Sequence, residues 1–166
     1  MTDVVRLVHK LCPNGVPHLP LGDLLRHEQP GRYLVRSTIY GPTNSTPVLT
    51  AGQTFVLGFT DEADGIYEAS SARPVVIFDD FTTAMKWVDF PFKAKSSAMK
   101  MLTAADDRVA SLRYLYYAMQ TIRYSPKDHS RQWIGTYSSF RVPVPPLEVQ
   151  REIVQILDHF TQLEAE

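Results

Sequence analysis

The segment RPVVIFDDF, residues 73–81, predicts the centre of the fold. Its four consecutive apolar residues, VVIF, are typical of a β-strand that is buried on both faces. Further strands are predicted for QTFVLGF (53–59), KWVDFPF (86–92) and AMKML (98–102), with a turn at DEADG (61–65). Several short strands joined by turns favour a mixed, mainly antiparallel sheet.

Helices are predicted on both sides of this strand-rich region. Residues 2–11 place apolar side chains on one face, and Thr2 is suited to cap that helix. Residues 103–123 change to helical spacing, with Val109, Leu112, Tyr116 and Met119 on one face. The stretch 28–46 is polar and turn-rich, and we expect loops there with one short strand at 33–36. The predicted fold class is therefore α+β, a mixed sheet with packed helices.

The segment RVPVPPLEVQREIVQILDHF, residues 141–160, predicts a short edge strand, a proline elbow and a helix. Pro145 and Pro146 fix the backbone before the helix and lack the N–H groups that a first helical turn leaves unpaired. A heptad seam follows, with spacings of 4, 3, 4 and 3, formed by Val149, Ile153, Ile156, Phe160 and Leu163.

A seam of this length requires a partner helix or a longer continuation, because short isolated helices are marginal in water. The alternative is a terminal helix that folds back on its own domain. The stiff elbow favours a helix that projects, as a coiled-coil stub.

Composition limits the function classes. The chain has 166 residues and a net charge of −1, so it is predicted to be one domain, with an appendage, and without a global basic field. A single cysteine, Cys12, favours a reducing compartment. The charged N-terminus is unlike a signal peptide, and no apolar run is long enough for a bilayer. We expect a cytoplasmic protein without a membrane partner.

Motifs for chemistry are missing from the sequence. No lysine has an acidic residue two positions before it, which a common metal-dependent nuclease motif requires. There is no phosphate-binding GxxxxGK[ST] loop and no glycine loop of a methyltransferase. The five histidines are scattered and Cys12 has no partner, so zinc is not expected. We expect no catalytic residue, no metal and no cofactor, and we expect Asp79 and Asp80 to cap a turn.

Four segments together resemble the specificity (S) subunit of Type I restriction-modification enzymes. They are LCPNGVPHLPLGDL (11–24), RPVVIFDDFTTAMKWVDFPFKAKSSAMKML (73–102), SLRYLYYAMQ (111–120) and VPVPPLEVQREIVQILDHFTQLEAE (142–166). The resemblance implies a DNA target recognition domain at 1–146 and the start of a conserved spacer helix at 147–166. It covers one recognition domain, whereas a full S subunit carries two, joined by an antiparallel coiled coil.

The resemblance also implies partners. In that family, modification subunits carry out methylation and a restriction subunit carries out cleavage. It therefore implies a non-catalytic reader of one half-site in double-stranded DNA, which docks on modification subunits and meets the restriction subunit through the complex. A homodimer through the C-terminal helix is a further expectation. The alternative is a protein-interaction module, or a half-subunit that regulates assembly, without DNA binding.

Three segments are candidates for DNA contact, because cations hold phosphates and fork-shaped or paired donors read base edges. The lysine-rich segment is expected to form a presented loop and supplies Lys86, Lys93, Lys95, Ser96, Ser97 and Lys100. The others supply Arg32, Tyr33 and Arg36, and Arg131 and Gln132, with Trp133 expected in the core. The competing interpretations are a solvated lysine loop and arginines that pair with acidic neighbours such as Asp23 or Glu28.

Overall fold

The computed structural model describes residues 3–165, and Thr2, the predicted cap, lies outside them. The described chain forms two compact units. The first contains residues up to 26, residues 104–124 and residues from 136 onward, and the second contains 27–103 and 125–135. The chain therefore leaves the first unit within β2 (Leu25–Glu28) and returns to it at the end of β8 (Met99–Ala104).

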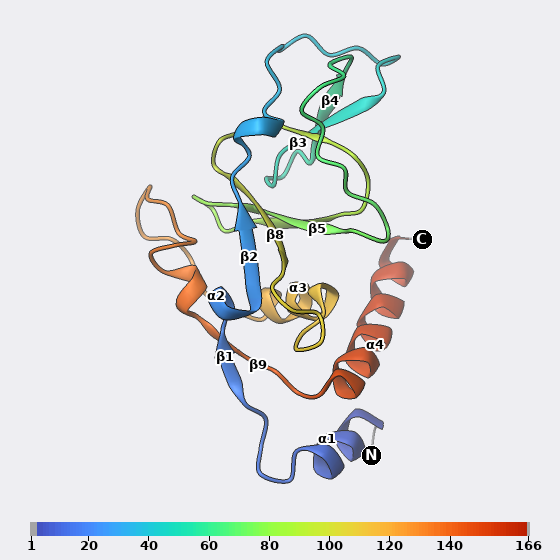
Figure 1. Cartoon of the computed structure of the whole chain (residues 1–166), viewed down its shortest axis with the longest axis vertical. Coiled ribbons are helices and arrows are strands. Elements are labelled where there is room, and N and C mark those ends of the chain that lie inside the picture. Colours follow the sequence, from blue (N-terminus) through green and yellow to red (C-terminus); the bar gives the residue numbers. More distant parts are fainter. Residues whose placement is uncertain (1–2, 166) are drawn as a thin grey trace. The chain divides into compact units, whose positions relative to one another are not determined.

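A four-stranded sheet has the predicted central strand in its interior (Figure 1). The order is β2-β8-β5-β6, where β5 is Val75–Asp79 and β6 is Met85–Val88. β5 runs antiparallel to both neighbours, and Ile77 lies opposite Lys86 on one side and Met101 on the other. Four of its five residues are fully buried, as the VVIF run predicts.

A second sheet is smaller and mixed. It has the order β4-β3-β7, formed by Val56–Thr60, Thr46–Leu49 and Lys93–Ala94. β3 pairs with β4 antiparallel and with β7 parallel. The α+β class with a mainly antiparallel arrangement is therefore confirmed. The strand expected at 33–36 is wrong, because a 3-10 turn occupies Gly31–Tyr33 and only Leu34 bridges to Ala94.

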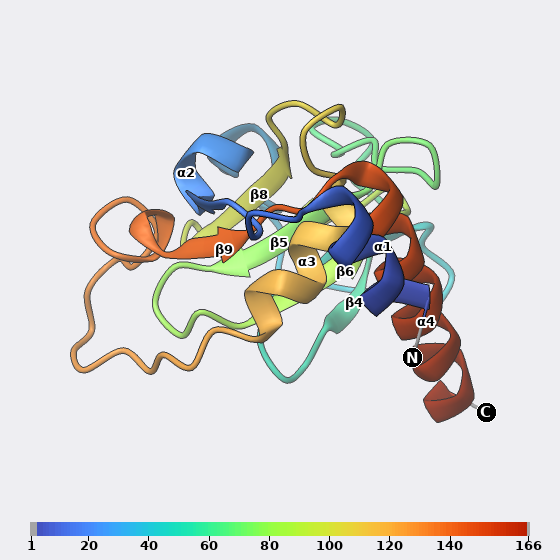
Figure 2. The same cartoon turned by 90° about the horizontal axis from the view of Figure 1, so that it is seen from below.

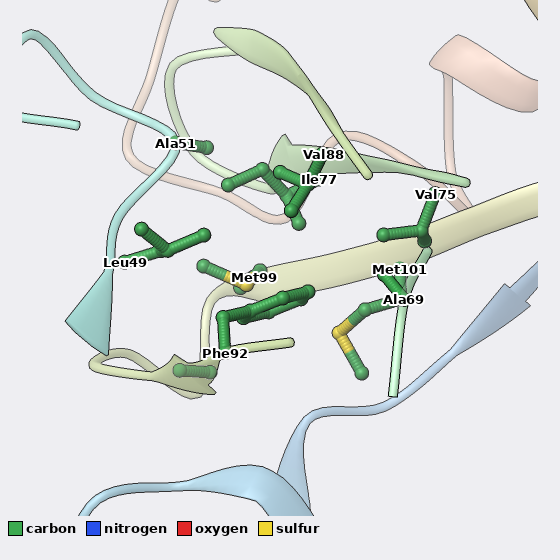
Figure 3. Close-up of a cluster of buried hydrophobic side chains, with 10 residues drawn as sticks. Leu49, Ala51, Ala69, Val75, Ile77, Val88, Phe92, Met99 and Met101 are labelled. Carbon is green, nitrogen blue, oxygen red and sulfur yellow. The ribbon is translucent and has the colours of Figure 1, made fainter. Parts of the chain in front are cut away.

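The core of the second unit joins these two sheets (Figure 3). Val75 and Ile77 of β5 and Met99 and Met101 of β8 contribute side chains from alternate strand positions, and Phe92 lies among them. Leu49 of β3 and Val88 of β6 belong to the same cluster. Alternate residues of one strand thus bury one face here, while Val76 and Phe78 are buried on the other.

The first unit is built mainly from helices. These are α1 (Asp3–Leu11), α2 (Leu21–Leu24), α3 (Leu112–Gln120), the 3-10 turn η2 (Tyr137–Ser139) and α4 (Leu147–Ala165). Its only paired strands among the described residues outside β2 and β8 are β1 (His18–Pro20) and β9 (Arg141–Pro143), which are antiparallel. Figure 2 shows α1 and α3 alongside α4, in agreement with the contacts between these helices.

The helix predicted at 103–123 is shorter than expected. α3 begins at Leu112 because the Ser111 side chain caps it, accepting a hydrogen bond from Tyr114 N. The preceding residues complete β8 and then form a turn, in which the Asp106 carboxylate accepts from Arg108 N. Local hydrogen bonding by this aspartate competes with helix formation, and Val109 is left exposed instead of facing a helix interior.

The C-terminal helix is present as predicted, but it does not project freely from its unit. It begins directly after the proline elbow, where the Pro146 carbonyl accepts from Val149 N and Gln150 N. Further along α4, the Asp158 carboxylate pairs with Arg113 of α3 at 2.7 Å. The expectation of a freely projecting rod is therefore wrong for these turns, since they pack against the unit that carries them.

Gln150 is the buried polar group that secures the start of α4. Its amide nitrogen donates to the carbonyl oxygens of Val109 (2.9 Å) and Pro145 (2.8 Å), and its amide oxygen accepts from Ser111 N (3.0 Å). The side chain is completely buried. These bonds satisfy three backbone groups, two in residues 109–111 and one at Pro145, and so connect the segment before α3 with the segment before α4.

Replacement of Gln150 by leucine is expected to lower the free energy of unfolding by at least about 2 kcal/mol, because it leaves buried backbone groups without partners. Equilibrium unfolding in urea measures this loss. The matched control is Gln155→Leu, an exposed glutamine of the same helix, which is expected to change stability by less than about 0.5 kcal/mol. Equal effects of the two substitutions would contradict the role given to Gln150.

Candidate nucleic-acid interface

A buried carboxylate organises the candidate site. Asp80, 1% exposed, follows β5 and accepts two backbone hydrogen bonds through Oδ1, from Gln132 N (3.1 Å) and Trp133 N (2.8 Å). Its Oδ2 pairs with Lys100 Nζ at 3.0 Å and with Arg131 Nη1 at 3.3 Å. Four donors therefore use the acceptor capacity of this carboxylate.

The charge of Asp80 is maintained despite its burial. Desolvation alone would raise the pKa of Asp80, but the hydrogen bond from Trp133 N and the charges of Lys100 and Arg131 outweigh it. The net pKa lies below its ordinary value of 3.8. The carboxylate is therefore ionised at neutral pH and keeps both cations in place.

These residues form one side of a pocket of about 370 Å³. Its lining consists of five polar or charged residues, Gln29, Asp80, Ser97, Lys100 and Arg131, and of Pro30, Gly31 and Ile134. One carboxylate and two cations give the lining a net charge of +1. The pocket can therefore accept a group with negative charge or with exposed lone pairs.

The segment that carries Arg131 is fixed to the turn after β5. The Phe81 ring stacks on His129 with the centroids 4.2 Å apart, and the Arg131 guanidinium lies 5.5 Å from the Phe81 centroid. Trp133 is buried as predicted, with its ring 5.4 Å from Phe78. The expectation that Asp79 caps a turn is confirmed, because its Oδ1 accepts from two backbone N–H groups. For Asp80 it is wrong, since Asp80 binds a different segment.

The predicted residues Arg32, Tyr33 and Arg36 follow the pocket residue Gly31 but are not part of the pocket lining, and both arginines are paired with carboxylates. Arg32 Nη2 and the Tyr33 hydroxyl both donate to Glu28 Oε1, at 3.0 and 2.9 Å. The Arg36 guanidinium makes two bonds to Asp64, at 2.9 and 2.8 Å, and thereby lowers the pKa of that carboxyl. Both arginines are exposed, and their contacts match the competing interpretation in which they hold a loop to acidic neighbours.

Lys93 is not in a presented loop. It belongs to β7, its side chain is buried, and Nζ donates to the Asp64 carbonyl oxygen at 2.7 Å. Gly65 makes room for this arrangement, with φ of 60° and with the place of a β-carbon only 2.4 Å from the Arg32 carbonyl oxygen. The interior position of Lys93 results from the pairing of β7 with β3, and the spacing of residues in the sequence does not reveal this pairing.

Two further candidates are also buried. Lys100 lies in β8 and is bound by Asp80 and by Gln29, and Gln132 is held through its backbone by Asp80. The expectation that these side chains are freely presented is therefore wrong. Lys95, Ser97 and Arg131 are exposed, while Lys86 and Ser96 are half-buried.

Sequence reasoning missed Gln29 and the role of Asp80. The available signal was Lys100, a single cation inside the otherwise apolar strand AMKML. A lysine in a strand whose neighbours are all buried needs a polar partner, and a carboxylate is one candidate. The choice of Asp80 as that partner depends on the register of β5 and β8, in which Phe78 lies opposite Lys100.

The predicted helix seam is divided by the structure. Val149 is buried and Ile153 half-buried within the first unit, whereas Ile156, Phe160 and Leu163 are 43%, 59% and 55% exposed. Three large apolar side chains at heptad spacing thus remain on the surface of α4.

The described residues contain neither a helix that could cross a membrane nor a group of three or more His, Cys, Asp or Glu residues that could hold a metal ion.

Comparison with known proteins gives a consistent relationship. No family profile matches the chain. The chain is 54% identical over 160 residues to the specificity subunit of the Type I restriction enzyme EcoR124I/EcoR124II from Escherichia coli. This match covers 91% of the chain and 39% of that protein.

Solved structures of the same kind share the fold. The S subunit of the Type I restriction-modification system from M. genitalium gives a TM-score of 0.67 at 14% identity, over 90% of this chain and 40% of that one. The HsdS subunit from Thermoanaerobacter tengcongensis gives 0.53 at 16% identity, over 98% and 43%. A chain of a type I R-M system studied for its complex assembly and conformational transition gives 0.63 at 16% identity, over 92% and 40%.

The fold and the sequence together relate this chain to one domain of the specificity subunits of Type I restriction-modification systems. The chain is related to the EcoR124I/EcoR124II specificity subunit over a length that corresponds to a single target recognition domain, which confirms the resemblance seen in the sequence. It spans about two fifths of the length of these relatives.

Substitution of Asp80 by asparagine is expected to lower the free energy of unfolding at pH 7 by about 3–5 kcal/mol, because it leaves buried Lys100 without its counter-charge. The folded-state pKa of Asp80 is depressed, so its contribution is fully present above about pH 4 and is lost as the pH falls through the folded-state pKa. The difference between wild type and variant should therefore shrink below pH 4. Urea unfolding at a series of pH values measures it, and a difference that stays constant down to pH 2 would contradict this assignment.

Proposed function

We propose that this chain is the sequence-specific DNA-reading part of a Type I restriction-modification complex and that it recognises one half of a bipartite target. The observation that carries the proposal is the 54% identity to a specificity subunit along 160 residues. The donor-rich pocket around Arg131 and Lys100 is consistent with this role, since DNA presents acceptors on its phosphates and base edges.

The exposed side chains are the stronger candidates for DNA contact. Arg131, Ser97 and Lys95 are accessible and come from neighbouring parts of the second unit, and Arg131 Nη1 lies 3.4 Å from the Ser97 carbonyl oxygen. Lys86 and Ser96 are the next candidates. Arg32, Tyr33 and Arg36 would have to exchange their carboxylate partners for DNA, and they therefore rank below Arg131.

The proposed partners follow from the class of protein. Modification subunits would carry out methylation, and a restriction subunit would join through the complex, while this chain would carry out no chemistry itself. The apolar seam on α4 is the proposed docking surface for another helix, either of a second copy or of a continuation with the same chemistry. We propose that the boundary between the recognition domain and the spacer helix lies between residues 146 and 147. In the structure, α4 belongs to the same compact unit as α1 and α3.

The competing proposal is a protein-interaction module, or a half-subunit that regulates assembly, without affinity for DNA. The exposed apolar residues of α4 fit this proposal, since they offer a surface for another helix. Both proposals use α4 for docking, and they differ only in whether the second unit meets DNA.

Salt dependence separates these two proposals. The chain assembled with modification subunits is expected to bind duplex DNA with an affinity that falls steeply with salt, because phosphate contacts release counterions. Lys95→Glu is expected to weaken binding to all duplexes and to reduce the slope of log K against log salt by about 1. The matched control is Lys10→Glu, an exposed lysine on α1 of the first unit, which should leave both quantities unchanged. Absence of any DNA affinity in the assembled complex would favour the protein-interaction module.

Charge placed in the α4 seam tests its role in docking. Ile156→Glu is expected to abolish self-association or docking through α4, because it places a carboxylate in an apolar interface. Sedimentation mass and affinity for modification subunits measure the effect, and the exposed neighbour Gln155→Glu is the control. The side chain of Ile156 is 43% exposed, so the fold should remain intact, which circular dichroism verifies. An unchanged mass together with an unchanged docking affinity would count against the seam.

A further inference from the structure

Gln29 directly follows β2 and lies at the pocket, and its carboxamide has a fixed orientation. Lys100 Nζ donates to Gln29 Oε1 at 3.0 Å. A lysine ammonium has only donors, so the amide atom that faces it must be the oxygen. The NH₂ group therefore occupies the other arm of the amide, and it has no hydrogen-bond partner within residues 3–165. Gln29 as a whole is exposed.

The group that fixes this orientation is itself held rigidly. Lys100 is 1% exposed and is bound by Asp80, whose two oxygens are already used by four donors. A buried ion pair of this kind contributes little to stability compared with apolar residues of the same size. Its consequence here is geometric, because Asp80 fixes Lys100 and Lys100 fixes the amide of Gln29.

The pocket consequently presents donors. The carboxylate of Asp80 has no acceptor capacity left, while the Gln29 NH₂ and the guanidinium of Arg131 remain available. The Arg131 side chain is 51% exposed, and only its Nη1 is hydrogen-bonded within the described residues. A matching ligand must therefore offer two or more adjacent acceptors.

DNA offers such acceptors on its phosphates, on the major-groove edge of guanine with N7 and O6, and on the minor-groove edge of an A·T pair with A N3 and T O2. A phosphate is bound well by any nearby cation and needs no oriented amide. An amide whose oxygen accepts from Lys100 offers its NH₂ group to a ligand, so it distinguishes acceptors from donors, and this distinction is what the reading of a base edge requires. The fixed amide therefore favours the base edge.

We propose that Gln29 is a specificity-determining residue that, together with Arg131, donates hydrogen bonds to the acceptor edge of one base pair, and that Asp80 and Lys100 are positioning residues that do not touch DNA. This proposal rests on the function proposed above and adds a residue to it. Gln29 supplies a donor in a fixed direction, and Arg131 supplies the forked cation beside it. Lys100, which the sequence suggests as a DNA contact, acts through Gln29.

The experiment uses the complete complex with modification subunits and a library of duplexes in which each target position is varied. Gln29→Ala is expected to lose about tenfold in discrimination at one base pair, while affinity for random duplexes and its salt slope stay as in the wild type. The exposed Gln120→Ala, on α3 of the first unit, is the matched control and should retain full discrimination.

The positioning role is tested by Lys100→Met, which keeps the length of the side chain and removes the ammonium. It is expected to relax discrimination at the same base pair as Gln29→Ala. The double variant Gln29→Ala with Lys100→Met should show no additional loss, because both substitutions act through one amide. Asp80→Asn with Lys100→Met, which leaves no unpaired buried charge, serves where Lys100→Met alone fails to fold. It should give the same position-specific loss.

The outcomes separate this proposal from the one on which it rests. A wild-type complex without any sequence preference would overturn the proposed function itself. A wild-type complex with a preference that Gln29→Ala retains at every position would overturn only the role of Gln29. Equal weakening of all duplexes by Gln29→Ala would identify a phosphate contact and would also overturn the assignment to a base edge.

Discussion

The carboxylate of Asp80 holds together segments of the second unit that are far apart in the sequence. Its oxygens bind the backbone at Gln132 and Trp133, the β8 cation Lys100 and the guanidinium of Arg131. Burial of Asp80 removes its hydration, so the protein must supply both a counter-charge and hydrogen-bond donors for the lone pairs of the carboxylate. The depressed pKa of Asp80 reflects that its partners outweigh the desolvation.

This constraint also determines which polar groups of the pocket are left for a ligand. The donors that bind Asp80 are occupied. The rest of the Arg131 guanidinium and the NH₂ group of Gln29 are left for a ligand. A molecule with a net charge of −1 can therefore offer a locally positive, donor-rich surface, which is what binding to DNA requires. The overall charge of the chain gives no indication of this local property.

The helix α4 combines two requirements in one element. Its first turn is anchored by Gln150, whose amide satisfies three backbone groups, and a later turn is held by the pair between Asp158 and Arg113. The same helix leaves Ile156, Phe160 and Leu163 exposed. Polar bonds and the buried Val149 thus attach the helix to its own unit, while the apolar residues of its later turns stay on the surface.

The sequence by itself determined the elements whose signals are local. The VVIF run placed β5, the proline elbow placed the start of α4, and the heptad spacing placed the apolar side chains Ile156, Phe160 and Leu163 along α4, because each depends on residues within a few positions of one another. The resemblance to specificity subunits was likewise carried by contiguous motifs. Only the tertiary structure decided that Lys93 and Lys100 are buried and that Asp80, Lys100 and Gln29 meet. Strand pairing between distant segments brings these groups together, and no local pattern specifies which buried cation will face which carboxylate.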